Sequence, residues 1–165
     1  AVFVSDSAGQ PVSGVELTAS ATPVKRVLGG TFLKGDWYWD EDESIYKPDV
    51  TVECNNEDIN GNGILDVGED TNGDEFLTPG IVGTLTFADT SITDENGQAE
   101  LEYRYPANYG YWYDMVITIF GQSTGSEASQ DHYYRLGVSS DDLTNEGAGL
   151  PANPFGSVPD CTTFN

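Results

Sequence analysis

The sequence predicts an all-β fold, a sandwich of about seven strands. Apolar and polar residues alternate with a period of two over several short segments, and turn-forming residues separate those segments. No stretch of the chain shows a convincing 3.6-residue periodicity, so long helices are not expected. The length of 165 residues suits one domain, or one domain with an arm.

The alternation is clearest in residues 15–21, 50–54 and 99–105, and each segment is predicted to be a strand with one buried face. Residues 115–120, MVITIF, are a continuous run of β-forming residues that suits burial on both faces. Two shorter strands are predicted at residues 85–87 and 132–136.

Turn residues separate these strands at residues 8–11, 95–97 and 121–126. Asn96-Gly97 is the strongest hairpin signal among them, because this pair adopts the positive φ angles that a tight turn needs.

Three segments do not fit a plain sandwich. Residues 33–46 are predicted to be an insertion rich in Asp, Glu and Trp, and residues 55–80 form a long acidic loop. Residues 137–165 form a tail rich in Pro and Gly with no strong strand. Long loops are usually functional or disordered, so function is expected here. The predicted organisation is a sandwich over residues 1–136 followed by the extended tail.

The two cysteines, Cys54 and Cys161, lie far apart and fit neither a CxxC redox motif nor a zinc motif. A disulfide is the favoured interpretation in an exported protein, and two free thiols are the alternative. The bridge would tie the tail to the domain. Cys54 shares the strand face of Val50 and Val52, so it is expected to point toward the core.

The charge of the chain excludes some partners. Asp and Glu number 28 against six Lys and Arg, which gives a formal net charge of −22. Nucleic acids and anionic lipids attract basic surfaces, so neither is an expected partner. No apolar run approaches the ~20 residues of a membrane span. The three Trp, nine Tyr and seven Phe argue for a packed core rather than disorder.

Residues 58–69, DINGNGILDVGE, match the calcium-loop pattern D-x-[DN]-x-[DN]-G-x5-E at every position. In this pattern side-chain oxygens at positions 1, 3 and 5 surround a cation, the carbonyl at position 7 faces inward, and positions 9 and 12 complete the sphere. The predicted ligands are Asp58, Asn60, Asn62, the carbonyl of Ile64, Asp66 and Glu69. A set of oxygen ligands favours Ca²⁺ over a transition metal.

A second, partial copy of the loop follows. Its predicted ligands are Asp70, Asn72, Asp74 and the carbonyl of Phe76. It departs from the pattern at position 6, where Glu75 replaces Gly, and at position 12, where Ile81 cannot bind a metal. A second ion would therefore need a ligand from elsewhere, and the candidates are Glu69, Asp66 and Glu57. The sequence predicts one or two Ca²⁺ ions, and the alternative is a solvated acidic loop without a cation.

Three stretches together resemble the bacterial immunoglobulin-like domains of the invasin/intimin type. Residues 4–15 resemble the first hairpin of that family, residues 93–99 resemble its TDxxGxA hairpin, and residues 116–119 resemble its closing core strand. The resemblance implies an Ig-like β-sandwich in a secreted or cell-surface module: an adhesin repeat, a stalk segment or a filament subunit. The calcium insert and the Cys-bearing tail depart from the short domains of that family.

A structural role follows from the resemblance. We expect a subunit of a bacterial extracellular filament or surface appendage, a homopolymer joined head to tail by the tail or by a donated N-terminal strand, Val2 to Val4. The alternatives are a calcium-dependent adhesin or carbohydrate-binding module that contacts surface glycans, and a spacer repeat of a longer surface protein. No enzyme is expected, because the single His, His132, has no nucleophile motif near it.

Aromatic residues form two clusters, at residues 37–39 and 109–113. One interpretation is packing in the core and at strand edges. The other is contact, either as anchors at a subunit interface or as a platform for sugar rings. Trp37 and Trp39 are the predicted interface residues.

Overall fold

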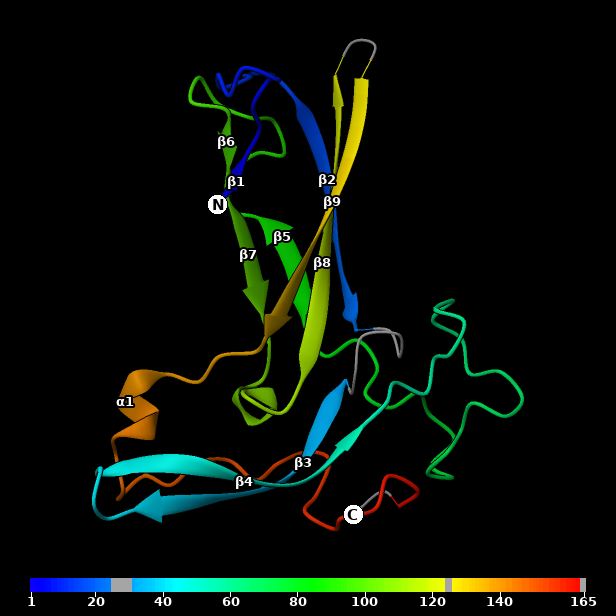
Figure 1. Cartoon of the computed structure of the whole chain (residues 1–165), viewed down its shortest axis with the longest axis vertical. Coiled ribbons are helices and arrows are strands. Elements are labelled where there is room, and N and C mark those ends of the chain that lie inside the picture. Colours follow the sequence, from blue (N-terminus) through cyan, green and yellow to red (C-terminus); the bar gives the residue numbers. More distant parts are fainter. Residues whose placement is uncertain (25–30, 124–125, 164–165) are drawn as a thin grey trace. The chain divides into compact units, whose positions relative to one another are not determined.

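The computed structural model describes residues 1–24, 31–123 and 126–163, and their regular structure is almost entirely β (Figure 1). Among these described residues, the helical elements are α1 (Ser140–Leu143) and one 3-10 turn, Ala107–Tyr109. This confirms the all-β class. The turn expected at residues 121–126 is wrong over its described residues, because one strand continues to Ser123 and the next begins at Ser126; residues 124 and 125 lie outside the described part of the chain.

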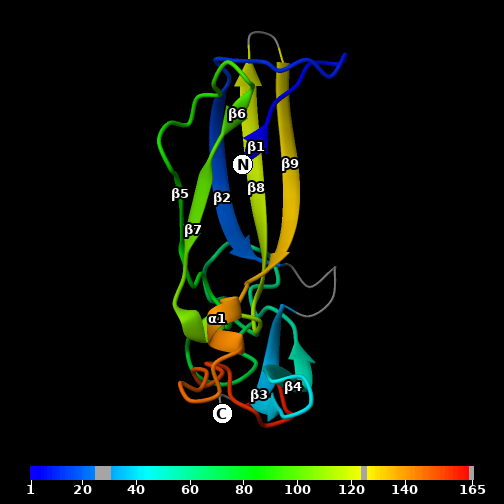
Figure 2. The ribbon, with the colours of Figure 1, turned by 90° about the vertical axis from the view of Figure 1, so that its left-hand side faces the viewer.

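Within the described ranges, the strands form four small sheets. Three of them pair β1 with β6, β3 with β4 and β5 with β7, and the fourth places β8 between β2 and β9 (Figure 2). The three two-stranded pairs are antiparallel. The strands are β1 (Val2–Phe3), β2 (Glu16–Pro23), β3 (Phe32–Asp40), β4 (Ile45–Cys54), β5 (Thr84–Phe87), β6 (Gln98–Ala99), β7 (Leu101–Arg104), β8 (Asp114–Ser123) and β9 (Ser126–Arg135).

The chain divides into two compact units. Unit 1 comprises residues 1–21, 83–105 and 116–132, and unit 2 comprises residues 22–82, 106–115 and 133–165. Each unit is therefore assembled from segments that are far apart in the sequence. The division after residue 136 that the sequence suggests stays a prediction.

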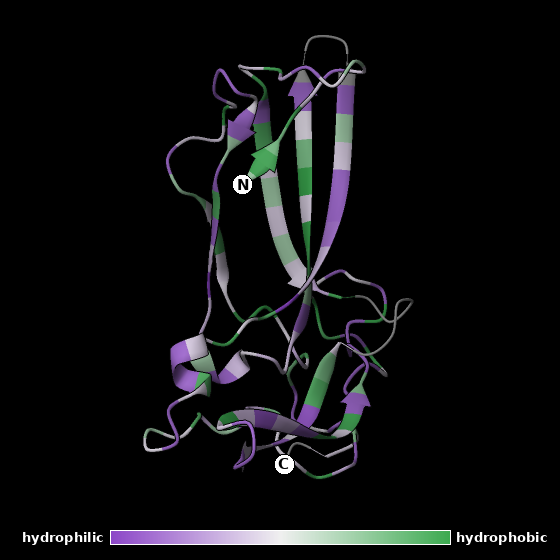
Figure 3. Cartoon of the chain, turned by 60° about the vertical axis from the view of Figure 1, so that its left-hand side comes forward, coloured by the Kyte–Doolittle hydropathy of each residue, from purple (hydrophilic) through white to green (hydrophobic). Residues whose placement is uncertain are grey.

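Unit 1 has a core in which the predicted alternation of β2 is confirmed. Val15 and Leu17 are buried with Ala99 of β6, while Glu16 between them is exposed. The half-buried side chains around them are Val2, Val4, Val12, Phe87 and Ile119. Figure 3 shows hydrophobic positions along β2 and β8, whereas β9 is largely hydrophilic.

The predicted turn at Asn96-Gly97 is present in unit 1. The Asp94 carboxylate accepts the backbone N–H groups of Asn96 and Gln98, both at 2.8 Å. Gly97 has a φ of 71°, and a Cβ on it would lie 2.5 Å from the Val4 carbonyl oxygen. Only glycine fits this close approach, which lets the Val4 N–H donate to the Gly97 carbonyl at 2.8 Å.

In unit 2, residues 33–46 are not an irregular insertion but most of an antiparallel hairpin. Strand β3 pairs with β4 from Phe32 opposite Cys54 to Asp40 opposite Ile45. A bulge after Lys34 interrupts the register, and a Cβ on Gly35 would lie 2.1 Å from a backbone oxygen of β4. The bulge turns the Lys34 side chain inward, where it is 1% exposed.

The two predicted interface residues pack within the chain. The Trp37 ring lies edge-on to Trp112 at 5.1 Å and to Tyr111 at 5.7 Å. The Trp39 ring lies edge-on to Tyr46 at 5.1 Å. Both Trp37 and Trp39 are half-buried, so the structure places them in intramolecular packing, and their role at a subunit interface stays a prediction.

The predicted disulfide is confirmed: Cys54 and Cys161 are bonded, with Cα atoms 5.6 Å apart. Cys54 is 1% exposed, as its expected orientation requires, although Val50 on the same strand is 39% exposed. The bridge fastens the tail to β4.

The tail also bonds to the β3 bulge. The buried Asn153 amide donates to the carbonyls of Leu33 and Gly35, at 3.0 and 3.1 Å. The Lys34 ammonium donates to the carbonyls of Asp160 and Thr163, at 2.8 and 2.9 Å. Residues 153–163 are therefore an integral part of unit 2.

Candidate metal centre

The acidic loop contains an internal repeat. Residues 57–68, EDINGNGILDVG, and residues 69–80, EDTNGDEFLTPG, share Glu-Asp at their start, an Asn-Gly pair, a Leu and a final Gly. The repeat is not apparent when the second loop is taken to start at Asp70. Each copy begins one residue earlier, at Glu57 or Glu69. We refer to the first copy as loop 1 and to the second as loop 2.

In loop 1, side-chain oxygens turn back onto the backbone amides that follow them. The Asp58 carboxylate accepts N–H groups from residues 61, 62 and 63 at 2.7, 3.0 and 2.9 Å. The Asn60 side-chain oxygen accepts the Asn62 N–H at 2.9 Å, and the Asn62 oxygen accepts the Ile64 N–H at 2.7 Å. The three predicted ligands at positions 1, 3 and 5 thus line one tight turn.

Glu69 closes loop 1 from its far end. Its side chain is 4% exposed, and its carboxylate accepts the backbone N–H groups of Ile59 and Asp66 at 3.0 and 2.9 Å. The amide groups of Asn60 and Asn62 each donate to the Asp66 carboxylate at 2.8 Å, and these bonds lower the Asp66 pKa. The predicted ligands at positions 9 and 12 therefore lie against the rest of the loop.

Loop 2 repeats this geometry. The Asp70 carboxylate accepts N–H groups from residues 73, 74 and 75 at 2.7, 3.1 and 3.2 Å. The Asn72 oxygen accepts the Asp74 N–H at 2.9 Å, and an Asp74 oxygen accepts the Phe76 N–H at 2.8 Å. The missing Gly at position 6 does not change the path of the loop.

The conformation at position 6 explains this tolerance. Glu75 has a φ of 67°, close to the φ of 74° at Gly63 in loop 1. A left-handed conformation costs a non-glycine residue on the order of 1 kcal/mol, which the hydrogen bonds around loop 2 offset.

Glu57 closes loop 2 as Glu69 closes loop 1. It is 5% exposed, and its carboxylate accepts the backbone N–H groups of Thr71, Asn72 and Thr78 at 3.0, 3.0 and 2.8 Å. These are positions 2, 3 and 9 of loop 2, the same positions that Glu69 contacts in loop 1.

The glutamate that begins each loop thus closes the other loop. Of the three candidates for the missing ligand of loop 2, the geometry favours Glu57, because Asp66 and Glu69 are both engaged in loop 1.

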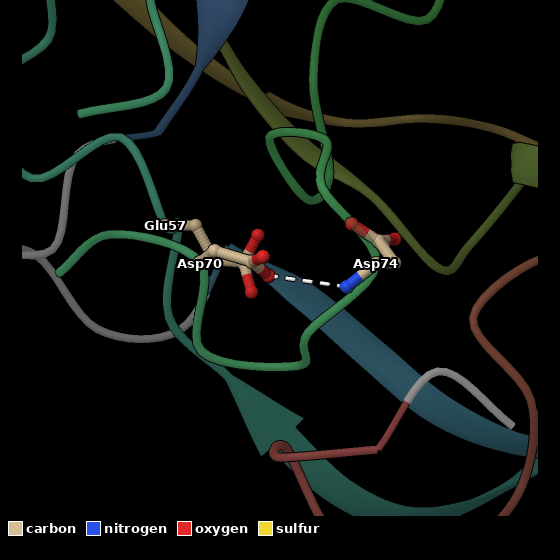
Figure 4. Close-up of side chains that lie close together, drawn as sticks. All are labelled: Glu57, Asp70 and Asp74. Atoms are coloured by element: carbon tan, nitrogen blue, oxygen red, sulfur yellow. Dashed lines mark hydrogen bonds between the residues drawn. The ribbon is translucent and has the colours of Figure 1, made fainter. Parts of the chain in front are cut away.

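Glu57, Asp70 and Asp74 form a cluster that could hold a metal ion, with one carboxylate oxygen from each within 4.8 Å of the others. Figure 4 shows these carboxylates near one another, with the bond from the Asp74 N–H to Asp70. Burial raises the Glu57 pKa, the nearby Asp74 charge raises it further, and the three backbone N–H donors partly offset this. A cation bound here would favour the charged form of Glu57.

The remaining predicted positions also have a place in this geometry. The side chains of Ile64 and Phe76 are 64% and 73% exposed, which suits residues predicted to act only through their carbonyls. Leu65 and Leu77, at position 8 of each loop, are half-buried.

Comparison of the chain with protein-family models, curated proteins and solved structures found no match. In the part of the chain that the structure describes, no helix has the length and hydropathy of a membrane span.

Proposed function

We propose that this chain is a calcium-stabilised structural subunit of a bacterial extracellular filament or surface appendage. The loops would bind one Ca²⁺ each, which would remove four units of the negative charge and fix the acidic segment in one conformation. The observation that carries the calcium part is the exchange of buried glutamates, Glu69 onto loop 1 and Glu57 onto loop 2.

Calcium suits this donor set better than other common cations. The side chains in both loops offer carboxylate and amide oxygens, and residues 58–69 follow the calcium pattern without a mismatch. Magnesium demands a more regular octahedral shell and tolerates a flexible twelve-residue loop less well.

The filament itself rests on the resemblance of residues 4–15, 93–99 and 116–119 to bacterial Ig-like surface domains. By that resemblance, unit 1 is proposed to be the Ig-like sandwich. A disulfide is compatible with an extracellular location, where oxidised cysteines persist.

Head-to-tail joining needs one segment to leave its own chain and dock on the next. Releasing the tail would require breaking the disulfide at Cys161 and exposing the Lys34 ammonium contacts. Releasing β1 would break no covalent bond: it would break the two residue pairs with β6 and a few neighbouring backbone bonds, and it would lose the packing of Val2 and Val4 on the unit 1 core. Strand donation by Val2 to Val4 is therefore the favoured route over tail docking. A heterologous contact of this kind continues into a filament when its rotation does not close.

The second candidate is a calcium-dependent adhesin or carbohydrate-binding module. Tyr38, which is 47% exposed on the β3–β4 hairpin, favours this alternative, since exposed aromatic rings stack on sugars. Trp37 and Trp39 are less accessible, because both pack on aromatic neighbours within the chain. A spacer repeat of a longer surface protein is the third possibility.

Negative-stain electron microscopy with and without calcium tests the proposal. Long regular fibres in calcium, lost on chelation, are the expected result. Single particles that bind glycans would support the adhesin instead. A native chain far heavier than 17.8 kDa would support the spacer.

A further inference from the structure

The two loops contain three Asn-Gly peptide bonds, at Asn60-Gly61, Asn62-Gly63 and Asn72-Gly73. An Asn-Gly bond is the dipeptide most prone to deamidation, because the small glycine lets its backbone nitrogen reach the Asn side chain. We propose that these bonds are deamidation sites which the folded loops protect, and that the Asp58 and Asp70 carboxylates provide this protection.

The chemistry needs one nitrogen and one carbon to meet. The glycine nitrogen loses its proton to solvent and bonds to the Asn side-chain carbonyl carbon, and ammonia leaves, which gives a cyclic imide. Water then opens the ring to Asp or to isoaspartate. No oxidant or cofactor is needed. Water is available, because Asn60, Asn62 and the glycines that follow all three Asn residues are exposed.

The attacking nitrogens are all engaged elsewhere. The N–H groups of Gly61 and Gly63 donate to Asp58 at 2.7 and 2.9 Å, and the N–H group of Gly73 donates to Asp70 at 2.7 Å. Each of these is a charge-assisted bond, stronger than a neutral one. The nitrogen must break this bond before it can reach the amide carbon.

The amides that would be attacked are also restrained. The Asn60 and Asn62 amide groups donate to Asp66, and the Asn72 amide donates to Thr78, each at 2.8 Å. Their side-chain oxygens accept N–H groups two residues further on, at 2.7–2.9 Å. Both reacting groups are therefore engaged in other hydrogen bonds while the loop stays folded.

Modification would change the loops in two ways. Conversion of Asn60 or Asn62 to Asp would add a carboxylate to a segment that already repels itself. An isoaspartyl linkage would instead add one backbone atom and shift the loop out of register. Opening of a loop would thus leave a permanent chemical mark on it.

A pair of reciprocal variants tests the proposal. Wild-type chain, Asp58→Ala and Asp70→Ala are aged together in mildly alkaline buffer, and each Asn is followed by peptide mass mapping. Chelator is present throughout, so that the outcome does not depend on calcium. Asn96-Gly97 is the internal control, because the Gly97 N–H donates to a backbone carbonyl of its own turn, at 3.0 Å.

Asp58→Ala is expected to speed modification of Asn60 and Asn62 about tenfold while leaving Asn72 and Asn96 near the wild-type rate, because one charge-assisted bond no longer has to open. Asp70→Ala is expected to speed Asn72 alone. Unchanged rates at Asn60 and Asn62 in Asp58→Ala, or an equal rise at all four sites, would overturn the assignment.

Discussion

Two buried side chains show how single residues determine the properties of unit 2. Glu57 and Lys34 are 5% and 1% exposed, and both are hydrogen-bonded mainly to backbone groups. A buried ionisable group costs free energy unless its partners compensate, so each should leave a measurable signature.

The pKa of Glu57 predicts how the stability of the fold depends on pH when no metal is bound. Burial raises its pKa in the folded chain above the ordinary value of 4.5, so the folded state binds the proton more tightly than the unfolded state. Linkage then requires the contribution of Glu57 to the free energy of unfolding to fall as the pH rises from about 4.5 through the raised pKa.

The measurement is the unfolding free energy of wild-type chain and Glu57→Gln in chelator across this pH range. The unfolding free energy of wild type relative to that of the variant should fall as the pH rises. A difference in unfolding free energy that grows with pH in favour of wild type would contradict the raised pKa of Glu57.

The contacts of Lys34 predict that it stabilises the tail. Its ammonium donates to the carbonyls of Asp160 and Thr163, and burial lowers its pKa. Lys34→Met removes both hydrogen bonds from the buried ammonium to the tail, so unfolding should become easier by about 1–3 kcal/mol. Lys47→Met is the matched control on the neighbouring strand, where the ion pair with Asp40 is partly exposed and a much smaller loss is expected.

Denaturant unfolding measures both variants, and hydrogen exchange of residues 153–163 locates the effect. Faster exchange there in Lys34→Met alone is the expected result. Equal losses of unfolding free energy in the two lysine variants would show that the buried Lys34 stabilises the fold no more than the partly exposed Lys47.

At the scale of elements, the disulfide joins β4 to the tail. Closing a loop of this length restricts the unfolded chain, and the chain-entropy model assigns the bridge about 4–5 kcal/mol. The double variant Cys54→Ser with Cys161→Ser should unfold at correspondingly lower denaturant and should no longer respond to reductant. If the wild type and the variant unfold at the same denaturant concentration, the bridge does not stabilise the fold.

The sequence predicted those elements whose residues alternate simply. Strands β2 and β7 lie where their period-two patterns placed them, because one face of each packs inward, and β5 lies at the shorter strand predicted at residues 85–87. The predicted strand at residues 50–54 is the second half of β4, but its partner β3 was missed. The buried positions of β3 include the charged Lys34, which breaks the apolar pattern and is compensated by the tail carbonyls.

The candidate site was predicted only in part for a similar reason. Spacing along the chain identifies Asp58 to Glu69 as one loop, since all these positions are local. The pairing of Glu57 with loop 2 depends on how two adjacent repeats fold against each other, which no single-loop pattern contains. The repeat of Glu-Asp at residues 57 and 69 is the signal that would have suggested it.

At the scale of the whole molecule, charge is the dominant constraint. A net charge of −22 opposes both compaction and the association of identical copies. Lys47, Arg104 and Arg135 already pair with carboxylates of the same chain, so they offer little neutralisation to a neighbour. In the proposed filament, bound cations would supply the missing positive charge, so fibre formation should depend on calcium more steeply than on monovalent salt.

The number of bound ions tests this account most directly. Native mass spectrometry in calcium should show two ions on the wild-type chain and one on Glu57→Gln, because the variant loses the closing ligand of loop 2 only. A wild-type chain that carries no calcium under these conditions would contradict the central claim that paired, glutamate-exchanging loops form a metal centre.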